Sequence, residues 1–114
     1  MDCSFPLTYG SLSVRLNQIM KVTGRDKIVK YGRKHSRARK PLATWLKITE
    51  VAKWEKSADI KATFGYVDNP KDNEYVFNIG GNNYRLIALV VIKNGIVIIK
   101  TIMTHSEYTK KYKP

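Results

Sequence analysis

The chain is poor in the residues from which proteins build disulfide bonds and metal centres. Among its 114 residues there is one cysteine, Cys3, and there are two histidines, His35 and His105. A single cysteine excludes a disulfide within the chain and a zinc site built from several thiolates. The two histidines are far apart, and neither stands in an HExxH or CxxC context. We therefore expect no metal and no other cofactor, and a reducing compartment such as the cytoplasm.

Long apolar runs are also missing. No stretch is long enough to span a bilayer. The first nineteen residues lack the basic start and apolar core of a secretory signal, so no membrane segment is expected. Hydrophobic residues nevertheless make up 43% of the chain, which is normal for a globular protein. The length suffices for one domain with a modest core.

Acidic residues are scarce relative to basic ones. The chain has 21 Lys and Arg against 9 Asp and Glu, which gives a formal net charge of +12. Such an excess repels itself and is typical of a polyanionic partner. RNA, DNA, an acidic membrane surface and an acidic protein all remain candidates. The alternative is a basic surface without a binding function.

The composition shifts near Met20. Residues 1–19 contain one basic and one acidic residue, whereas residues 21–40 contain nine basic residues and a single acid. This shift indicates a domain over residues 20–114, with residues 1–19 as an extension or an incorrectly assigned start. The alternative, weighed equally, is a first strand within the sequence LSVRLNQIMKV, residues 12–22.

Three helices are expected before the C-terminal third of the chain. The first begins at residues 23–26, whose Thr-Gly-Arg-Asp sequence resembles a capping box with Asp in place of Glu. The second covers about residues 37–53, and Pro41 must lie in its first turn or mark its start, because a proline deeper inside breaks a helix. Ser and Asp residues favour a third, short helix over residues 57–64. Residues 65–74 are rich in turn formers and predict a loop.

The last third of the chain reads as an antiparallel sheet followed by a short helix. Residues 75–79, 84–92 and 96–103 are rich in β-branched and aromatic side chains. The dipeptide Asn94-Gly95 is a strong hairpin signal between the last two strands. Thr104 can then cap a terminal helix.

Two-residue turns at residues 81–82 and 94–95 would determine the strand register and sort the side chains between two faces. The expected pairs are Asn78 with Arg85, Leu89 with Lys100, and Ile87 with Ile102. The face to be covered by helices would carry Tyr75, Phe77, Ile79, Tyr84, Leu86, Ala88, Val90, Ile92, Val97, Ile99, Thr101 and Met103. The open face would carry Val76, Asn78, Arg85, Ile87, Leu89, Val91, Ile98, Lys100, Ile102 and Thr104.

Arg85 and Lys100 are the only charges on the expected open face. A cation among apolar neighbours is costly unless it is paired or hydrated, and no acid is expected on the sheet. The pattern therefore indicates an anion site. The alternative is that Arg85 bonds the C-terminal residues or a loop acid such as Asp68. His105 and Tyr108 follow the last strand on one helix face, although a structural cap and core packing explain each of them taken singly.

The segments FNIGGN (77–82), YR (84–85) and THSEY (104–108), together with PLATW (41–45), resemble the HigB toxins of bacterial toxin–antitoxin systems. The resemblance covers about residues 20–110. HigB toxins belong to the RelE/ParE superfamily, which implies an α+β fold with two N-terminal helices packed on a small twisted antiparallel sheet and a short C-terminal helix. It also implies metal-independent cleavage of messenger RNA on translating ribosomes, through attack by the RNA 2′-OH. The implied partners are mRNA, the ribosome and a helix-turn-helix antitoxin of the HigA type.

The resemblance suggests roles for particular residues of the site. Arg85 would clamp the phosphate, Lys100 would stabilise charge, His105 would act as acid or base, and Tyr108 would orient or stack on the RNA. The expected RNA-binding residues are Asn78, Asn82, Lys61, Lys110, Lys30, Arg33, Lys34 and Arg37. For the basic helix residues, the alternative is a solvated face.

Three other functions compete with this interpretation. A ParE-like toxin would share the fold and the basic surface but poison DNA gyrase. A non-catalytic RNA- or DNA-binding protein would show salt-sensitive binding without cleavage. A degenerate toxin would have its site blocked by the N-terminal extension.

Overall fold

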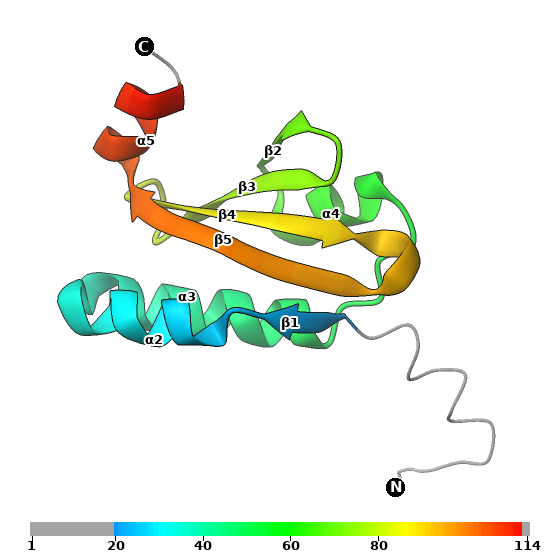
Figure 1. Cartoon of the computed structure of the whole chain (residues 1–114), viewed down its shortest axis with the longest axis horizontal. Coiled ribbons are helices and arrows are strands. Elements are labelled where there is room, and N and C mark those ends of the chain that lie inside the picture. Colours follow the sequence, from blue (N-terminus) through cyan, green and yellow to red (C-terminus); the bar gives the residue numbers. More distant parts are fainter. Residues whose placement is uncertain (1–19, 113–114) are drawn as a thin grey trace, which may run out of the picture.

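A five-stranded sheet with helices against one face forms the main body of the chain (Figure 1). The computed structural model describes residues 20–112. Residues 1–19 lie outside it, so the predicted extension there stays a prediction. The elements are, in order, β1 (Lys21–Thr23), α2 (Arg25–Lys34), α3 (Ser36–Glu50), α4 (Ser57–Phe64), β2 (Val67–Lys71), β3 (Glu74–Ile79), β4 (Tyr84–Val91), the 3₁₀ turn η1 (Ile92–Asn94), β5 (Ile96–Thr104) and α5 (His105–Tyr112).

The α+β class is confirmed, but the sheet is mixed rather than purely antiparallel. Its strand order is β1-β5-β4-β3-β2. The short edge strand β1 runs parallel to β5, and the other neighbours are antiparallel. Gly24 follows β1 with a φ of 98°, and a Cβ there would lie 3.1 Å from both Cβ and the carbonyl oxygen of Ile99. Glycine therefore lets the chain turn sharply from β1 into α2 against β5.

Two sequence-based expectations about the first helices are wrong in detail. The helix α2 begins as expected, but no side chain caps it, since its N-cap is Gly24. Pro41 lies in the second turn of α3, because this helix begins at Ser36 instead of near Pro41. The proline ring cannot donate a hydrogen bond to the carbonyl of Arg37. The helix tolerates this loss near its start, where few hydrogen bonds precede it.

The predicted loop over residues 65–74 contains an edge strand. The strand β2 pairs with β3, placing Val67 opposite Phe77 and Asp68 opposite Val76 before the register shifts. Turn-forming residues are compatible with this position because Pro70 lies in an edge strand, where an N–H is not required on the open side. The same error concealed the first residue of β3, Glu74, which the prediction assigned to the loop.

The main core lies between the helices and one face of the sheet. Trp45 of α3 meets Phe77 of β3 edge to face, with ring centroids 5.3 Å apart, and Phe64 of α4 meets Phe77 in the same way. Leu42, Leu86 and Val90 are fully buried around them. These contacts supply the apolar burial that holds α3 and α4 on the sheet.

The register between β3 and β4 is as predicted, whereas that between β4 and β5 is not. Asn78 lies opposite Arg85. Leu89, however, pairs with Ile98 instead of Lys100, and Ile87 pairs with Thr101. The connection after β4 includes the 3₁₀ turn and is longer than the expected two residues. A bulge between the Ile87 and Ala88 pairs then places Lys100 as the extra residue of β5.

The bulge exchanges the faces of the end of β5. Ile102 pairs with Leu86 and packs against the main core, although it was expected on the open face. Met103 was expected on the covered face, but it clusters with Val76 and Ile87 on the open side. Because successive side chains of a strand alternate, one extra residue is enough to make this exchange. The open face consequently gains an apolar centre.

Candidate active site on the open face of the sheet

Arg85 is the centre of the polar contacts at one end of the open face. It is only 7% exposed. Its Nη1 donates to the carbonyl oxygens of Asn82 (3.3 Å) and Tyr84 (3.1 Å). Its Nη2 donates to Oδ1 of Asn82 (2.7 Å) and lies 2.7 Å from Nδ1 of His105. The guanidinium thus connects the β3–β4 loop to the start of α5. This agrees with the alternative prediction that Arg85 bonds residues near the C-terminus.

The contact between Arg85 and His105 determines which imidazole nitrogen carries the proton. A guanidinium has only donors, so Nδ1 of His105 must accept. The neutral imidazole then carries its hydrogen on Nε2. His105 is exposed, and it therefore offers an N–H donor to a ligand on the open face.

The four Nη hydrogens of Arg85 are all used within the protein. Among the described residues, none of the partners of Arg85 is a carboxylate. Its positive charge is consequently not neutralised by an acid. Its two Nη groups, which could otherwise grip two phosphate oxygens, already have partners in the protein. A phosphate gripped by both ends of that fork would have to displace His105 or the Asn82 loop.

The helix α5 is capped by Thr104, as the sequence predicted, and the cap is a complete capping box. The N–H of Thr104 donates to Oε1 of Glu107 (2.8 Å), and the N–H of Glu107 donates to Oγ1 of Thr104 (3.1 Å). Hydrogen bonds to the carboxylate from the backbone N–H of Thr104 and, to a smaller extent, from its side chain lower the pKa of the Glu107 carboxyl below its ordinary value. The two bonds of the capping box also hold the first turn of α5, which carries His105.

Replacing Thr104 with alanine is expected to lower the free energy of unfolding by about 1 kcal/mol, because the Glu107 N–H loses its acceptor. Urea denaturation followed by circular dichroism measures the change. Ser106→Ala removes an exposed hydroxyl from the same turn and serves as the control. A loss as large in the control would contradict the role of the capping box.

The contribution of the Glu107 carboxylate to stability should also depend on pH. A lowered pKa in the folded state means that the charged form is stabilised by folding. The contribution is complete above the pKa of the unfolded chain and disappears as the pH falls through the lower folded value. The difference between wild type and Glu107→Gln should therefore be complete near about pH 7 and should decrease as the pH falls below the ordinary carboxyl pKa of about 4. It should stay small, because the carboxylate is exposed.

Tyr108 packs into the open face rather than standing free on α5. It is 5% exposed and clusters with Val76, Ile87 and Met103. The guanidinium carbon of Arg85 lies 5.8 Å from the centroid of its ring. Most of the Tyr108 side chain is therefore packed in a core, as the alternative prediction stated. Its ring also stabilises the position of the Arg85 guanidinium through the cation–π contact.

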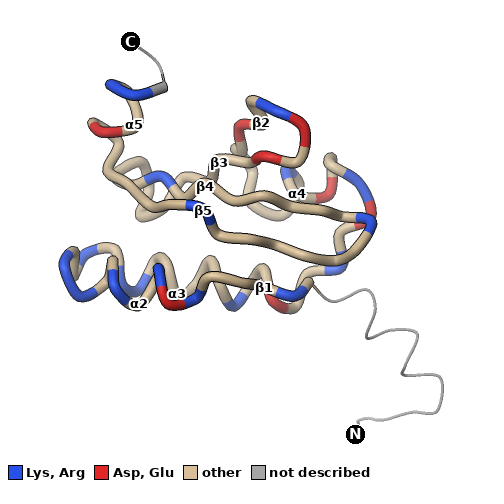
Figure 2. The backbone as a smooth tube through the Cα atoms, viewed as in Figure 1, with Lys and Arg blue, Asp and Glu red and all other residues tan. Residues whose placement is uncertain are grey.

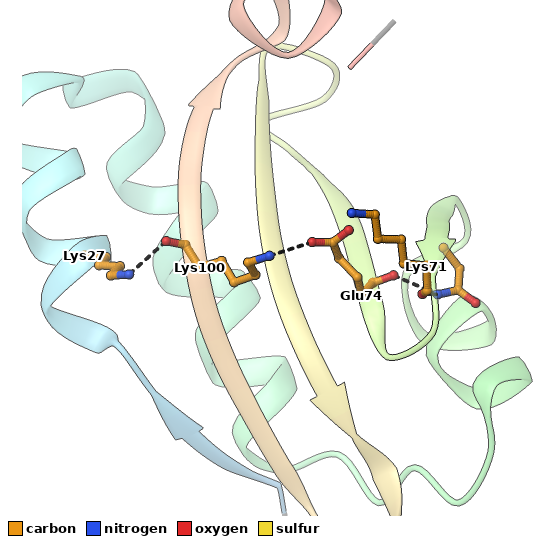
Figure 3. Close-up of polar contacts among 5 residues, drawn as sticks. Lys27, Lys71, Glu74 and Lys100 are labelled. Carbon is orange, nitrogen blue, oxygen red and sulfur yellow. Dashed lines mark hydrogen bonds and ion pairs between the residues drawn. The ribbon is translucent and has the colours of Figure 1, made fainter. Parts of the chain in front are cut away.

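Lys100 is paired with an acid, contrary to the expectation that the sheet carries none. Its Nζ lies 2.8 Å from Oε2 of Glu74, whose residue is 9% exposed (Figure 3). Lys27 of α2 donates to the carbonyl oxygen of Lys100 at 2.8 Å. Lys100, at the bulge, is thus held by Glu74 through its side chain and by Lys27 through its backbone carbonyl. Glu74 was overlooked because the strand was expected to begin one residue later; a hydrophobic pattern gives no signal for an acid at a strand start.

A cleft of about 380 Å³ opens on this face next to the ion pair. Its lining residues come from β2, β3, β4 and α5. They are Asp68, Asn69, Pro70, Lys71, Glu74, Val76, Ile87 and Tyr108. Since Tyr108 also lies against Arg85, the cleft and the Arg85–His105 contact belong to one continuous surface.

An aromatic group supports the same end of the sheet from the helical side. Tyr31 of α2 stacks on His35 with centroids 4.2 Å apart, and both meet Tyr84 of β4 at their edges. Burial, with smaller contributions from Glu107 and Tyr84, raises the pKa of Tyr31 to about 12. Tyr31 therefore stays a neutral phenol, and His35 belongs to this packing.

The remaining predicted RNA-binding residues are dispersed. Asn82 faces Arg85, whereas Asn78 also lines a separate cleft with Pro41, Trp45 and Gly80. Lys61 lies on α4, well away from α5 (Figure 1). Lys and Arg gather near the α2–α3 junction, at the same end of the molecule as α5 (Figure 2). Five predicted RNA-binding cations lie on these helices and are all exposed, namely Lys30, Arg33, Lys34, Arg37 and Lys110.

Two further properties concern the described residues 20–112. None of their helices is long and apolar enough to cross a membrane. They contain no group of three or more His, Cys, Asp or Glu residues that could hold a metal ion.

Comparison with known proteins identifies the family. A model of the HigB toxins, described as the RelE-like toxic component of a toxin–antitoxin system, matches residues 38–111, which is more than half of the chain. The chain belongs to the HigB toxin family. The matched segment includes Glu74, Arg85, Lys100, His105 and Tyr108, so the whole open-face site lies within the HigB region.

Curated HigB proteins share sequence with this family member. The chain is 42% identical over 57 residues to the mRNA interferase toxin HigB of Escherichia coli K12, and equally to the mRNA interferases HigB of E. coli O157:H7 and Shigella flexneri. The alignments cover 48% of this chain and 55% of each relative. The chain thus spans about half the length of the curated HigB relatives it matches.

Proposed function

We propose that this protein is a toxin that cleaves messenger RNA. Its HigB relatives are named mRNA interferases. The observation that carries the proposal is the Arg85–His105 pair, which presents an N–H donor beside an arginine without a carboxylate partner among the described residues. The RelE/ParE arrangement would make the open face of the sheet the RNA-binding face. Cleavage would take place on translating ribosomes in the cytoplasm and would stop translation.

The reaction can proceed with the RNA, the protein and water. The 2′-oxygen of a ribose attacks the adjacent phosphorus and loses its proton to a water molecule. The bond from phosphorus to the 5′-oxygen breaks, and that oxygen takes up a proton from water, which leaves a cyclic phosphate and a 5′-OH. Negative charge grows on the phosphoryl oxygens between these events, so donors and cations aimed at them accelerate the reaction.

His105 would act as a donor to the phosphoryl or leaving oxygen. Its Nδ1 accepts from Arg85, so its Nε2 holds a hydrogen and has no lone pair with which to remove a proton. A base role would require the contact with Arg85 to break. Neutral imidazole donors of this kind stabilise developing oxyanions in other enzymes.

Arg85 would act in two ways. Its charge lies next to the phosphate bound at His105 and stabilises the transition state. Its Nη2 also holds the tautomer and orientation of His105, while Asn82 holds Arg85. Lys100 adds positive charge farther along the face, partly balanced by Glu74. Tyr108 supports Arg85 and leaves part of its surface to the adjoining cleft.

The basic residues near the α2–α3 junction would contact ribosomal RNA phosphates, because they lie at the same end of the molecule as the site. Such contacts position the toxin without reading sequence. A helix-turn-helix antitoxin of the HigA type would neutralise the toxin. The family description names a toxin–antitoxin system as its setting.

The proposal is tested by adding the purified protein to a bacterial translation reaction and mapping new 5′ ends on the message. We expect cuts carrying a 5′-OH within the translated region, dependent on ribosomes. A mock purification from cells without the gene is the control. Absence of new ends, together with inhibited supercoiling by gyrase, would replace this function with that of a gyrase poison.

A further inference from the structure

The cleft beside Glu74 has the properties of a nucleobase-binding site. We propose that it binds the base of a nucleotide next to the cleavage site, and that Glu74 selects bases with an exocyclic amino group over uracil. The inference rests on the proposed function, since it requires RNA on the open face. It adds a binding subsite and a specificity-determining residue.

The size and lining of the cleft suit a base. Its volume of about 380 Å³ is in the range of small-ligand pockets. Val76, Ile87 and Tyr108 supply an apolar wall, against which the flat face of a base can lie. Polar groups at the other side come from the β2–β3 turn and the start of β3. An apolar wall with a few converging polar groups is the usual design of a ligand site.

Glu74 offers a fixed acceptor to that cleft. The residue is 9% exposed, and its Oε2 is held by Lys100 at 2.8 Å. The Glu74 side chain keeps 12% of its surface exposed, and it lines the cleft. A carboxylate that is held by Lys100 and open to the cleft can accept a hydrogen bond from a ligand. Figure 3 shows the carboxylate between Lys100 and the β2–β3 turn.

The turn beside Glu74 is held rigidly by Asn69. Its Nδ2 donates to the carbonyl oxygens of Lys71 and Glu74, both at 2.7 Å. These bonds fix the position of the Asn69 amide, and Asn69 also lines the cleft. Polar groups held by the fold discriminate more sharply than mobile surface groups, because no ordering is required when the base binds.

The chemistry of the bases follows from these acceptors. A carboxylate accepts from the 4-amino group of cytosine, and equivalent amino donors occur on adenine and guanine. Uracil has a carbonyl oxygen in place of that amino group, and its N3–H donor lies between two carbonyl oxygens that a carboxylate repels. A carboxylate is also an unusual choice for a surface that binds RNA through its phosphates. Glu74 pairs with Lys100 there, and its carboxylate can accept a further hydrogen bond from a base in the cleft.

The cleft is close enough to the cleavage site for one RNA strand to reach both. Tyr108 lines the cleft and also lies under Arg85. Along β4, the partner of Glu74 is Leu89, four residues from Arg85, which is about 13 Å along the strand. A phosphate at His105 and a base beside Glu74 can thus belong to one short single-stranded segment.

Binding of cytosine and uracil hexanucleotides to the full chain tests the proposal, because these bases differ mainly in the group that Glu74 would contact. Fluorescence anisotropy with His105→Ala in the background avoids cleavage. We expect the cytosine hexamer to bind about tenfold more tightly than the uracil hexamer. Glu74→Gln should reduce that ratio to about threefold or less, since its amide can also donate to a carbonyl. Asp72→Asn removes an exposed acid of the same turn and should keep the full ratio.

Each result separates this proposal from the proposed function. Equal binding of the two hexamers by the Glu74-containing protein would overturn the base site even if messages are cut. An unchanged ratio in Glu74→Gln, with the circular dichroism spectrum preserved, would remove Glu74 from base selection. A clear ratio that depends on Glu74, in a protein that cuts no RNA, would support the base site and refute the enzymatic function.

Discussion

Substitution of His105 by alanine is expected to lower the rate of RNA cleavage by about a hundredfold to a thousandfold. Loss of a single preorganised donor to a developing oxyanion has an effect of this size. The rate is measured as the appearance of new 5′ ends in a translation reaction with saturating protein. The fold should be retained, because the His105 side chain is exposed.

The substitution His105→Gln distinguishes a donor from a proton-transfer group. A glutamine amide can present an N–H near the position of Nε2, but it cannot exchange a proton at neutral pH. If His105 acts as a neutral donor, His105→Gln should recover about tenfold of the loss caused by alanine. If His105 transfers a proton, glutamine and alanine should be equally inactive, and the tautomer set by Arg85 would not describe the reacting state.

Replacing Arg85 with lysine is expected to lower the cleavage rate by about a hundredfold, nearly as much as replacing it with alanine. Lysine keeps the positive charge but has no planar fork. It cannot bond the Asn82 loop and Nδ1 of His105 at the same time, as Arg85 does through both Nη groups. His105 would then lose the partner that orients it.

The same kinetic assay with matched variants tests this explanation. Lys93→Ala removes an exposed cation at the other end of β4 and should leave the rate unchanged. Asn82→Ala should cause an intermediate loss, because Arg85 keeps its bond to the Tyr84 carbonyl and its contact with Tyr108. Full activity in Arg85→Lys would show that charge alone matters at this position.

The predictions for His105 and Arg85 depend partly on what the sequence indicates about Arg85 and partly on its contacts in the folded chain. The expectation that Arg85 forms an anion site came from a cation among apolar neighbours on a face where no acid was expected. The register of β3 and β4 confirms only its pairing with Asn78. The expectation that Arg85 clamps a phosphate with two hydrogen bonds considered only the arginine side chain and not its neighbours in the fold. Only the folded chain shows that its fork is filled by Asn82, Tyr84 and His105.

Local patterns determined much of this protein. Helix caps, β-branched runs and turn residues specified the helices, three strands of the sheet and the capping box of α5, because each of these depends on residues close together in the chain. The segments FNIGGN, YR and THSEY indicated the HigB family, which the comparison confirms. The positive charge indicated a polyanionic partner before any element was placed.

The tertiary structure decided the features that depend on distant residues. The bulge at Lys100 exchanged the faces of Ile102 and Met103, and no short-range pattern marks a single extra residue in a strand. The pairing of Lys100 with Glu74, 26 positions away, required the strands to be in register. The sequence therefore determined which chemical groups this chain carries and the local elements that hold them. Only long-range packing decided which of those groups meet, because contacts between distant residues depend on the sum of every turn and bulge between them.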